Sequence, residues 1–167
     1  MYYRLKYPKF KELQNSLSPI LLESKFNVNN YNGIITKELN EFINFLKSDP
    51  LIHETLRIPV AEQTHCHRDL HAGTNYIWSV NIPVLGYNNS YTAFWKTKGP
   101  PSKPNGLWVW PLASCQLITK FYTKEIFIMD TRIPHSIHNN TERFTYMLRM
   151  PLSWDISALD EYIQHDS

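Results

Sequence analysis

Residues 64–71 read Thr64-His65-Cys66-His67-Arg68-Asp69-Leu70-His71 and stand at the end of a β-like run. Side chains alternate between the two faces of a strand, so His67 and Asp69 are expected to point to the same side. A second cluster, Ile133-Pro134-His135-Ser136-Ile137-His138-Asn139, follows much later in the chain. An imidazole and a carboxylate on one strand, joined by a distant imidazole, are typical of the facial triad that binds non-haem Fe(II). The pattern predicts a metal centre of His67, Asp69 and His135.

The region around these clusters reads as short strands separated by Pro, Gly and Asn. The expected strands cover 56–67, 75–84, 90–96, 108–110, 114–122, 125–129, 136–139 and 144–150. About eight strands at this spacing predict a mainly β domain, either a sandwich or a barrel-like jelly roll.

Helices are expected on either side of the β region. Residues 36–47 place Leu39, Phe42, Ile43 and Leu46 on one stripe, with Thr36 as the N-cap. A weaker helix is predicted over 9–17, and a final one over 156–164, capped by Ser153 or Asp155. The chain is therefore interpreted as a single domain, with helical support in 1–55, a β core in 56–152 and a C-terminal helix in 153–167.

Composition narrows the class of protein. Hydrophobic residues make up 43% of the 167 residues and charged residues 19%, as in an ordinary globular domain. A net charge of +2 without a basic run argues against nucleic acid as a partner, and no apolar run reaches the length of a membrane span. No secretory signal is recognised, so a cytoplasmic location is expected. The two cysteines, Cys66 and Cys115, show no framework spacing, and Cys66 is expected to be buried and to face away from His67.

An arginine could complete such a site by binding an acidic co-substrate, because its planar fork matches a carboxylate. Arg143 and Arg149 lie on one face of the last expected strand. Arg143 is favoured because its distance from His135 suits a strand that pairs back against the His135 strand. Arg149 is expected to lie too far along.

Several elements together resemble the Fe(II)/2-oxoglutarate-dependent dioxygenase superfamily. They are His67-Arg68-Asp69, Val80-Asn81-Ile82-Pro83-Val84, the segment Ile128-Met129-Asp130-Thr131-Arg132-Ile133-Pro134-His135-Ser136-Ile137-His138-Asn139, and Arg143. The chain is most similar to small members related to aspartyl/asparaginyl β-hydroxylases. The resemblance covers about residues 56–152.

This resemblance implies a double-stranded β-helix that is cupin-like. It also implies hydroxylation of a C–H bond in a small molecule or peptide side chain, with Fe(II), 2-oxoglutarate and dioxygen. The implied iron ligands are His67, Asp69 and His135, and the implied 2-oxoglutarate anchor is Arg143. The aspartyl β-hydroxylases proper lack a carboxylate ligand, which this chain keeps, so their substrate is not inherited. The interval from His135 to Arg143 is also shorter than is usual in the family.

Further pocket residues and two rival functions complete the sequence-based hypothesis. Asn81 and Tyr76 are candidates for co-substrate contacts, and the aromatic candidates for the pocket are Trp78, Tyr91, Trp95, Trp108 and Trp110. One rival is a cupin-type metalloenzyme that uses His65, His67 and His135. The other is a non-catalytic jelly-roll binding module whose histidines are satisfied structurally.

Overall fold

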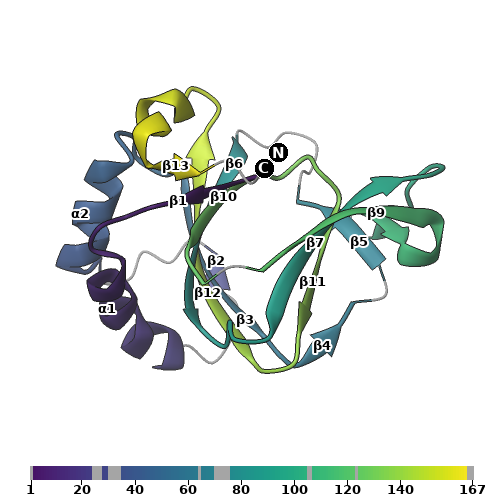
Figure 1. The fold of residues 1–167 in the computed structure, drawn as a ribbon, viewed down its shortest axis with the longest axis horizontal. Helices are drawn as coiled ribbons and strands as arrows, with labels where there is room; N and C mark the ends of the chain where they lie inside the picture. The colour runs from purple at the N-terminus through teal and green to yellow at the C-terminus, as the bar shows by residue number, and fades with distance from the viewer. Residues whose placement is uncertain are drawn as a thin grey trace.

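A computed structural model describes residues 2–23, 28–29, 35–63, 65–69, 76–104, 107–122 and 124–164. The fold is mainly β, with two antiparallel sheets arranged as a sandwich (Figure 1). The first sheet has the order β13-β1-β10-β6-β12-β3-β2, with bounds Ile163–Gln164, Tyr2–Leu5, Ile126–Asp130, Tyr76–Leu85, Arg143–Pro151, Ile52–Ile58 and Val28–Asn29. The second has the order β8-β5-β11-β7-β9, with bounds Trp108–Pro111, His65–Arg68, His135–Asn139, Ser90–Thr97 and Cys115–Phe121. The short β4 (Ala61–Glu62) also pairs with β11.

Two helices, α1 (Phe10–Glu23) and α2 (Lys37–Phe45), cover the outer face of the seven-stranded sheet (Figure 1). The main hydrophobic core lies between them and that face, where side chains such as Ile82 and Leu148 are fully buried. Because strand side chains alternate, the other face of the same sheet turns toward the second sheet. Because the main hydrophobic core lies on the helix-covered face, the inner face can hold polar side chains.

The helix predicted over 36–47 is confirmed as α2, which ends two residues earlier, at Phe45. The stripe of Leu39, Phe42, Ile43 and Leu46 is buried, and the Thr36 hydroxyl accepts a hydrogen bond from the backbone N–H of Leu39 at 3.1 Å. A cap of this kind contributes about 1 kcal/mol. Helix α1 extends beyond the predicted residue 17, since Leu21 continues the buried row of Leu13 and Leu17.

The termini differ from the expectation. The segment 1–55 is not only helical: β1, β2 and the start of β3 lie in it. Strand β1 pairs with β10 and so covers what would otherwise be an exposed sheet edge. At the C-terminus, residues 156–162 form the 3₁₀ helix η3 (Ile156–Tyr162), with Asp155 as its cap, and β13 follows in place of a longer helix.

The expected single strand over 56–67 was wrong. It is three strands, β3, β4 and β5, and β3 and β5 lie in different sheets. The break falls at Pro59, which has no N–H to donate to a strand ladder. This crossing carries His67 to the sheet opposite β3. The other expected strands match β6 to β12 to within one or two residues.

Candidate metal centre

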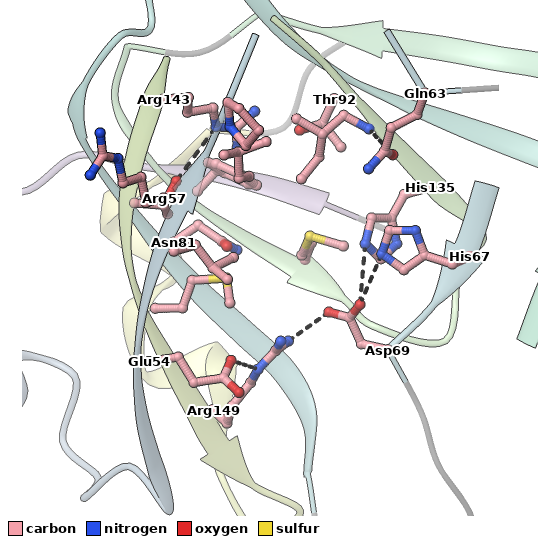
Figure 2. Close-up of a pocket in the computed structure, with 18 residues that line it drawn as sticks. Glu54, Arg57, Gln63, His67, Asp69, Asn81, Thr92, His135, Arg143 and Arg149 are labelled. Atoms are coloured by element: carbon pink, nitrogen blue, oxygen red, sulfur yellow. Dashed lines mark hydrogen bonds and ion pairs between the residues drawn. The ribbon is translucent and has the colours of Figure 1, made fainter. Parts of the chain in front are cut away.

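A cavity of about 360 Å³ lies between the two sheets (Figure 2). Strands β3, β6, β10 and β12 supply one wall, and β5, β7 and β11 supply the opposite wall. Most of the lining residues are polar: they are Glu54, Arg57, Gln63, His67, Asp69, Asn81, Thr92, His135, Arg143, Thr145 and Arg149. The apolar lining residues are Leu56, Ile58, Pro59, Phe127, Met129, Ile137 and Met147. This volume falls in the range of small-molecule sites.

Three of the lining residues bring their donor atoms together. His67 and His135 are register partners on β5 and β11, and their ring centroids lie 4.5 Å apart. Oδ1 of Asp69 lies 3.3 Å from Nε2 of His67 and 3.5 Å from Nε2 of His135. Donors about 2.1 Å from a shared ion and at right angles around it would be about 3 Å apart. The cluster could hold a metal ion.

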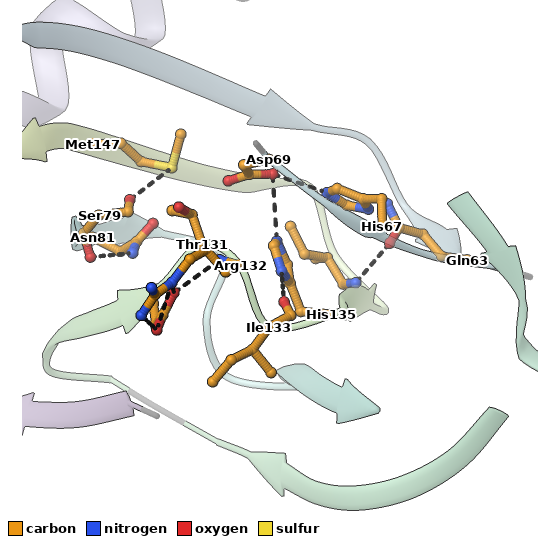
Figure 3. Close-up of polar contacts among 12 residues, drawn as sticks. Gln63, His67, Asp69, Ser79, Asn81, Thr131, Arg132, Ile133, His135 and Met147 are labelled. Atoms are coloured by element: carbon orange, nitrogen blue, oxygen red, sulfur yellow. Dashed lines mark hydrogen bonds and ion pairs between the residues drawn. The ribbon is translucent and has the colours of Figure 1, made fainter. Parts of the chain in front are cut away.

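A backbone carbonyl orients the His135 ring (Figure 3), and a backbone hydrogen bond holds the main chain at Asp69. Nδ1 of His135 lies 2.9 Å from the carbonyl oxygen of Ile133. Because a carbonyl only accepts, Nδ1 carries the proton and Nε2 offers its lone pair to the cluster. The backbone N–H of Asp69 donates to the carbonyl oxygen of Thr131 at 3.3 Å. The turn before β11 therefore positions both the carboxylate and the second imidazole.

Arg149 holds the other oxygen of the Asp69 carboxylate. Its Nη1 donates to Oδ2 of Asp69 at 2.7 Å, and its Nε donates to Glu54 at 2.8 Å. The Arg149 side chain is only 7% exposed, so this network lies largely out of water. Sequence reasoning placed Arg149 too far along the strand and did not consider Glu54. Arg143 and Arg149 lie on the same face of one strand, and this spacing could have predicted that both arginines face the cavity, as they do.

The protonation states of His135 and Asp69 favour the binding of a metal cation. Burial lowers the pKa of His135 to about 4, so this imidazole is neutral at physiological pH. Burial raises the pKa of Asp69, but Arg149 and the two imidazoles outweigh it and hold that pKa well below its ordinary value. A neutral imidazole and an ionised carboxylate are the forms that bind a divalent metal.

Arg143 lies across the cavity from the two imidazoles (Figure 2). It is 3% exposed, and its guanidinium lies 4.5 Å from the ring centroid of Tyr87. Its Nε has a long contact of 3.5 Å to the Thr145 hydroxyl. Among the described residues, no carboxylate lies within ion-pair distance of Arg143. A buried cation without a balancing anion is costly unless a ligand supplies the charge.

The reason given for favouring Arg143 was wrong, although its side chain does face the cavity. Strand β12 pairs with β3 and β6, and not with the His135 strand β11. The two strands lie in opposite sheets, so His135 and Arg143 approach the cavity from opposite walls. The interval along the chain does not set the distance between them.

Of the other predicted pocket residues, some line the cavity and others do not. Asn81 lines the cavity, and its amide donates to the carbonyl oxygen of Ser79. The side chain of Tyr76 lies outside the described residues, as do His71 and His165. The five other aromatic candidates do not line the cavity. Trp78, for example, packs against the core under the helices.

The other histidines that the structure describes, His53, His65 and His138, are not part of the cluster. His65, a ligand in the cupin-type alternative, is exposed and is not one of the three residues whose donor atoms come together. His138 is buried, contacts the Ser136 hydroxyl at 2.8 Å and stacks on Tyr91. His53 is partly buried against the Tyr146 hydroxyl at 2.9 Å, and burial lowers its pKa.

Cys66 is fully buried, as its place on β5 predicted. Its sulfur lies 3.6 Å from that of Cys115, and both are free thiols. Burial raises the pKa of Cys66 to about 12. None of the helices in the described part of the chain has the length and apolar character of a membrane span.

Comparisons with known proteins add little to this geometry. No protein-family model matches the chain, and the search of curated proteins gives no match either. Among solved structures, the chain is similar to the crystal structure of AviO1 from Streptomyces viridochromogenes Tue57. The identity is 13% and the TM-score 0.45, over 92% of this chain and 89% of that chain.

Proposed function

We propose that this protein is an Fe(II)- and 2-oxoglutarate-dependent dioxygenase that hydroxylates a C–H bond of a small molecule or peptide side chain. The observation that carries the proposal is the pairing of two features in one cavity. A His-Asp-His donor cluster lies on one side, and the buried, uncompensated Arg143 lies on the other.

The proposed fold is a double-stranded β-helix, or jelly roll. Its support is the strand order β10-β6-β12-β3 in one sheet and β5-β11-β7-β9 in the other. From β3 onward the chain passes repeatedly between the sheets, which is how paired Greek keys form a jelly roll. Under this arrangement β1, β2, β8 and β13 are additions at the edges.

His67, Asp69 and His135 are the residues that would hold Fe(II). The bound metal would activate dioxygen with electrons supplied by oxidative decarboxylation of 2-oxoglutarate, which yields succinate and carbon dioxide. With three protein ligands, a bound metal would still have room for the co-substrate and dioxygen. Since Arg149 occupies Oδ2 of Asp69, only Oδ1 faces the imidazoles. The Asp69 carboxylate would therefore bind the metal through one oxygen.

The charges of the cavity favour a dianionic co-substrate. Glu54 and Asp69, the two carboxylates of the lining, both pair with Arg149, and Arg57 is paired with Glu142 at the rim. When Arg143 is added, these charged groups sum to zero, although no carboxylate among the described residues contacts Arg143. A divalent metal would therefore add two positive charges that nothing in the lining neutralises. 2-Oxoglutarate carries two negative charges, and its distal carboxylate matches the planar fork of Arg143.

The apolar part of the lining would protect the reaction from water. Leu56, Ile58 and Ile137 lie among the polar groups, and Phe127 and Met129 belong to a small cluster between the sheets. Excluding water lowers the local dielectric constant, which strengthens the attraction between the charged groups of the cavity and the co-substrate. These side chains would also give an apolar surface on which a substrate C–H bond can lie.

The test is the conversion of 2-oxoglutarate to succinate by purified protein with Fe(II), ascorbate and dioxygen. Slow turnover is expected without the true substrate, because the cluster and Arg143 suffice to bind the reactants. His67→Ala should abolish it. The matched control is His65→Ala, which changes an exposed histidine on the same strand and should retain it.

Two results would favour the rivals. Metal binding by the wild type with no succinate above the His67→Ala background would support the binding module. Loss of metal binding in His65→Ala would support the cupin-type ligand set.

A further inference from the structure

Two thiols meet beside the strand that carries His67, on the face opposite the His67 side chain. Cys66 lies in the middle of β5, and Cys115 is the first residue of β9. Two strands separate β5 from β9 in the sheet order. Their sulfurs are nevertheless 3.6 Å apart, because the chain passes from β8, the neighbour of β5, through the short 3₁₀ helix η2 (Leu112–Ser114) directly into β9.

The two thiols differ in their access to solvent. Cys66 is 0% exposed, whereas Cys115 is partly exposed. The Cys115 sulfur also lies 3.4 Å from the carbonyl oxygen of Pro111, which orients it beside the end of β8. An oxidant from solution would therefore meet Cys115 first, with a second thiol already in contact behind it.

The position of Cys66 connects this pair to the metal cluster. Residue 66 precedes His67, and its side chain points to the opposite face of β5. Strand β5 pairs with β11 through a single residue pair, His135 with His67, and its other neighbour is the edge strand β8. Strand β9, by contrast, pairs with β7 over most of its length. A bond from Cys66 to Cys115 would tie the weakly paired ligand strand to the firmly paired part of the sheet.

We propose that Cys66 and Cys115 form a reversible disulfide in response to hydrogen peroxide, and that this bond stabilises the strand that carries His67. In the first step the Cys115 sulfur attacks peroxide; an S–O bond forms, the O–O bond breaks, and water leaves. In the second step the Cys66 sulfur attacks the resulting sulfenic acid; the S–S bond forms, the S–O bond breaks, and a second water leaves with the thiol proton. Overall the thiols lose two electrons and two protons, and peroxide is reduced to two waters.

The inference does not depend on the proposed dioxygenase function. A bond that closes this long a loop restricts the unfolded chain, so the oxidised protein should melt about 10 °C above the reduced protein. A thiol reductant should return the melting temperature to its starting value. The change should be the same with and without added metal.

The experiment treats the full chain with hydrogen peroxide and maps its peptides by mass spectrometry, with dimedone present to trap sulfenic acid. The wild type should lose two hydrogens, give a Cys66–Cys115 cross-linked peptide and take up little dimedone. Cys66→Ala should instead carry dimedone on Cys115, because the resolving thiol is gone. Cys115→Ser should react with neither reagent, since Cys66 is buried.

Peptide mapping and melting of the wild type test the proposed disulfide even if a variant fails to fold. Absence of the intramolecular peptide, a sulfinic acid on Cys115, or a disulfide between two molecules would overturn the proposal. So would a cross-linked protein that melts at or below the temperature of the reduced form.

Discussion

Replacement of Arg143 by Met tests the co-substrate site most sharply. The guanidinium is buried and faces the cavity without a carboxylate partner among the described residues. If it binds the distal carboxylate of 2-oxoglutarate, its loss leaves that carboxylate unpaired in a closed site. Truncation of one partner of a buried charged pair costs about 2–5 kcal/mol. Taking about 3 kcal/mol, the Kd for 2-oxoglutarate should rise about 150-fold.

The same variant should behave in the opposite way without ligand. A buried guanidinium that lacks an anion destabilises the free protein, so Arg143→Met should unfold at the same or a higher denaturant concentration than the wild type. Arg143→Lys keeps the charge and loses the fork, and its affinity for 2-oxoglutarate should fall by about tenfold. Loss of affinity without loss of stability separates a ligand-binding role from a structural one.

The assay is anaerobic calorimetric titration of 2-oxoglutarate into protein loaded with Mn(II), with Mn(II) affinity measured separately for each variant. Mn(II) affinity should not change in the Arg143 variants. An Arg143→Met protein that binds 2-oxoglutarate within about threefold of the wild type would refute the reasoning. A marked fall in stability would refute it too, because the arginine would then be held by the fold itself.

Three further predictions concern the surroundings of the site. Arg149→Met should weaken Mn(II) binding by about 10–100-fold, because the Asp69 carboxylate loses the partner that orients it; calorimetry with Mn(II) alone measures this. The pKa of His135 is about 4 in the folded protein and about 6.5 in the unfolded chain. In protein treated with chelator, His135 should therefore lower the free energy of unfolding by about 2 kcal/mol between pH 7 and pH 5. The unfolded state gains this proton first as the pH falls, so stability is lost toward acid, and His135→Asn should lack this part of the slope in urea titrations. Gly86→Ala should lower the free energy of unfolding by at least about 2 kcal/mol, because φ is +79° and a Cβ would overlap a neighbouring backbone carbonyl. Gly99→Ala is the control: φ is +75° but the surrounding space is open, so the loss should be only about 1 kcal/mol. Chemical denaturation of both variants measures the difference.

Local patterns in the sequence were enough for several features of this protein. The stripe from Leu39 to Leu46 and the Thr36 cap specify α2, because helix periodicity and capping act within a few residues. Strand parity likewise predicted that Cys66 faces away from His67, and Cys66 does not line the cavity. Clusters of ligand-type residues around His67 and His135 identified the side chains that come together in the cavity. Their role as iron ligands stays a prediction.

Only the tertiary structure decided how distant strands pair. Nothing local in the sequence says that β12 lies between β3 and β6, opposite the His135 strand, because pairing partners are chosen by burial over the whole domain. That choice gives Arg143 and His135 opposite walls of the cavity. It also brings Arg149 and Glu54 to Asp69, a contact that spacing along the chain argued against. The sequence thus determined which residues face inward, and the packing of the two sheets determined which of them meet.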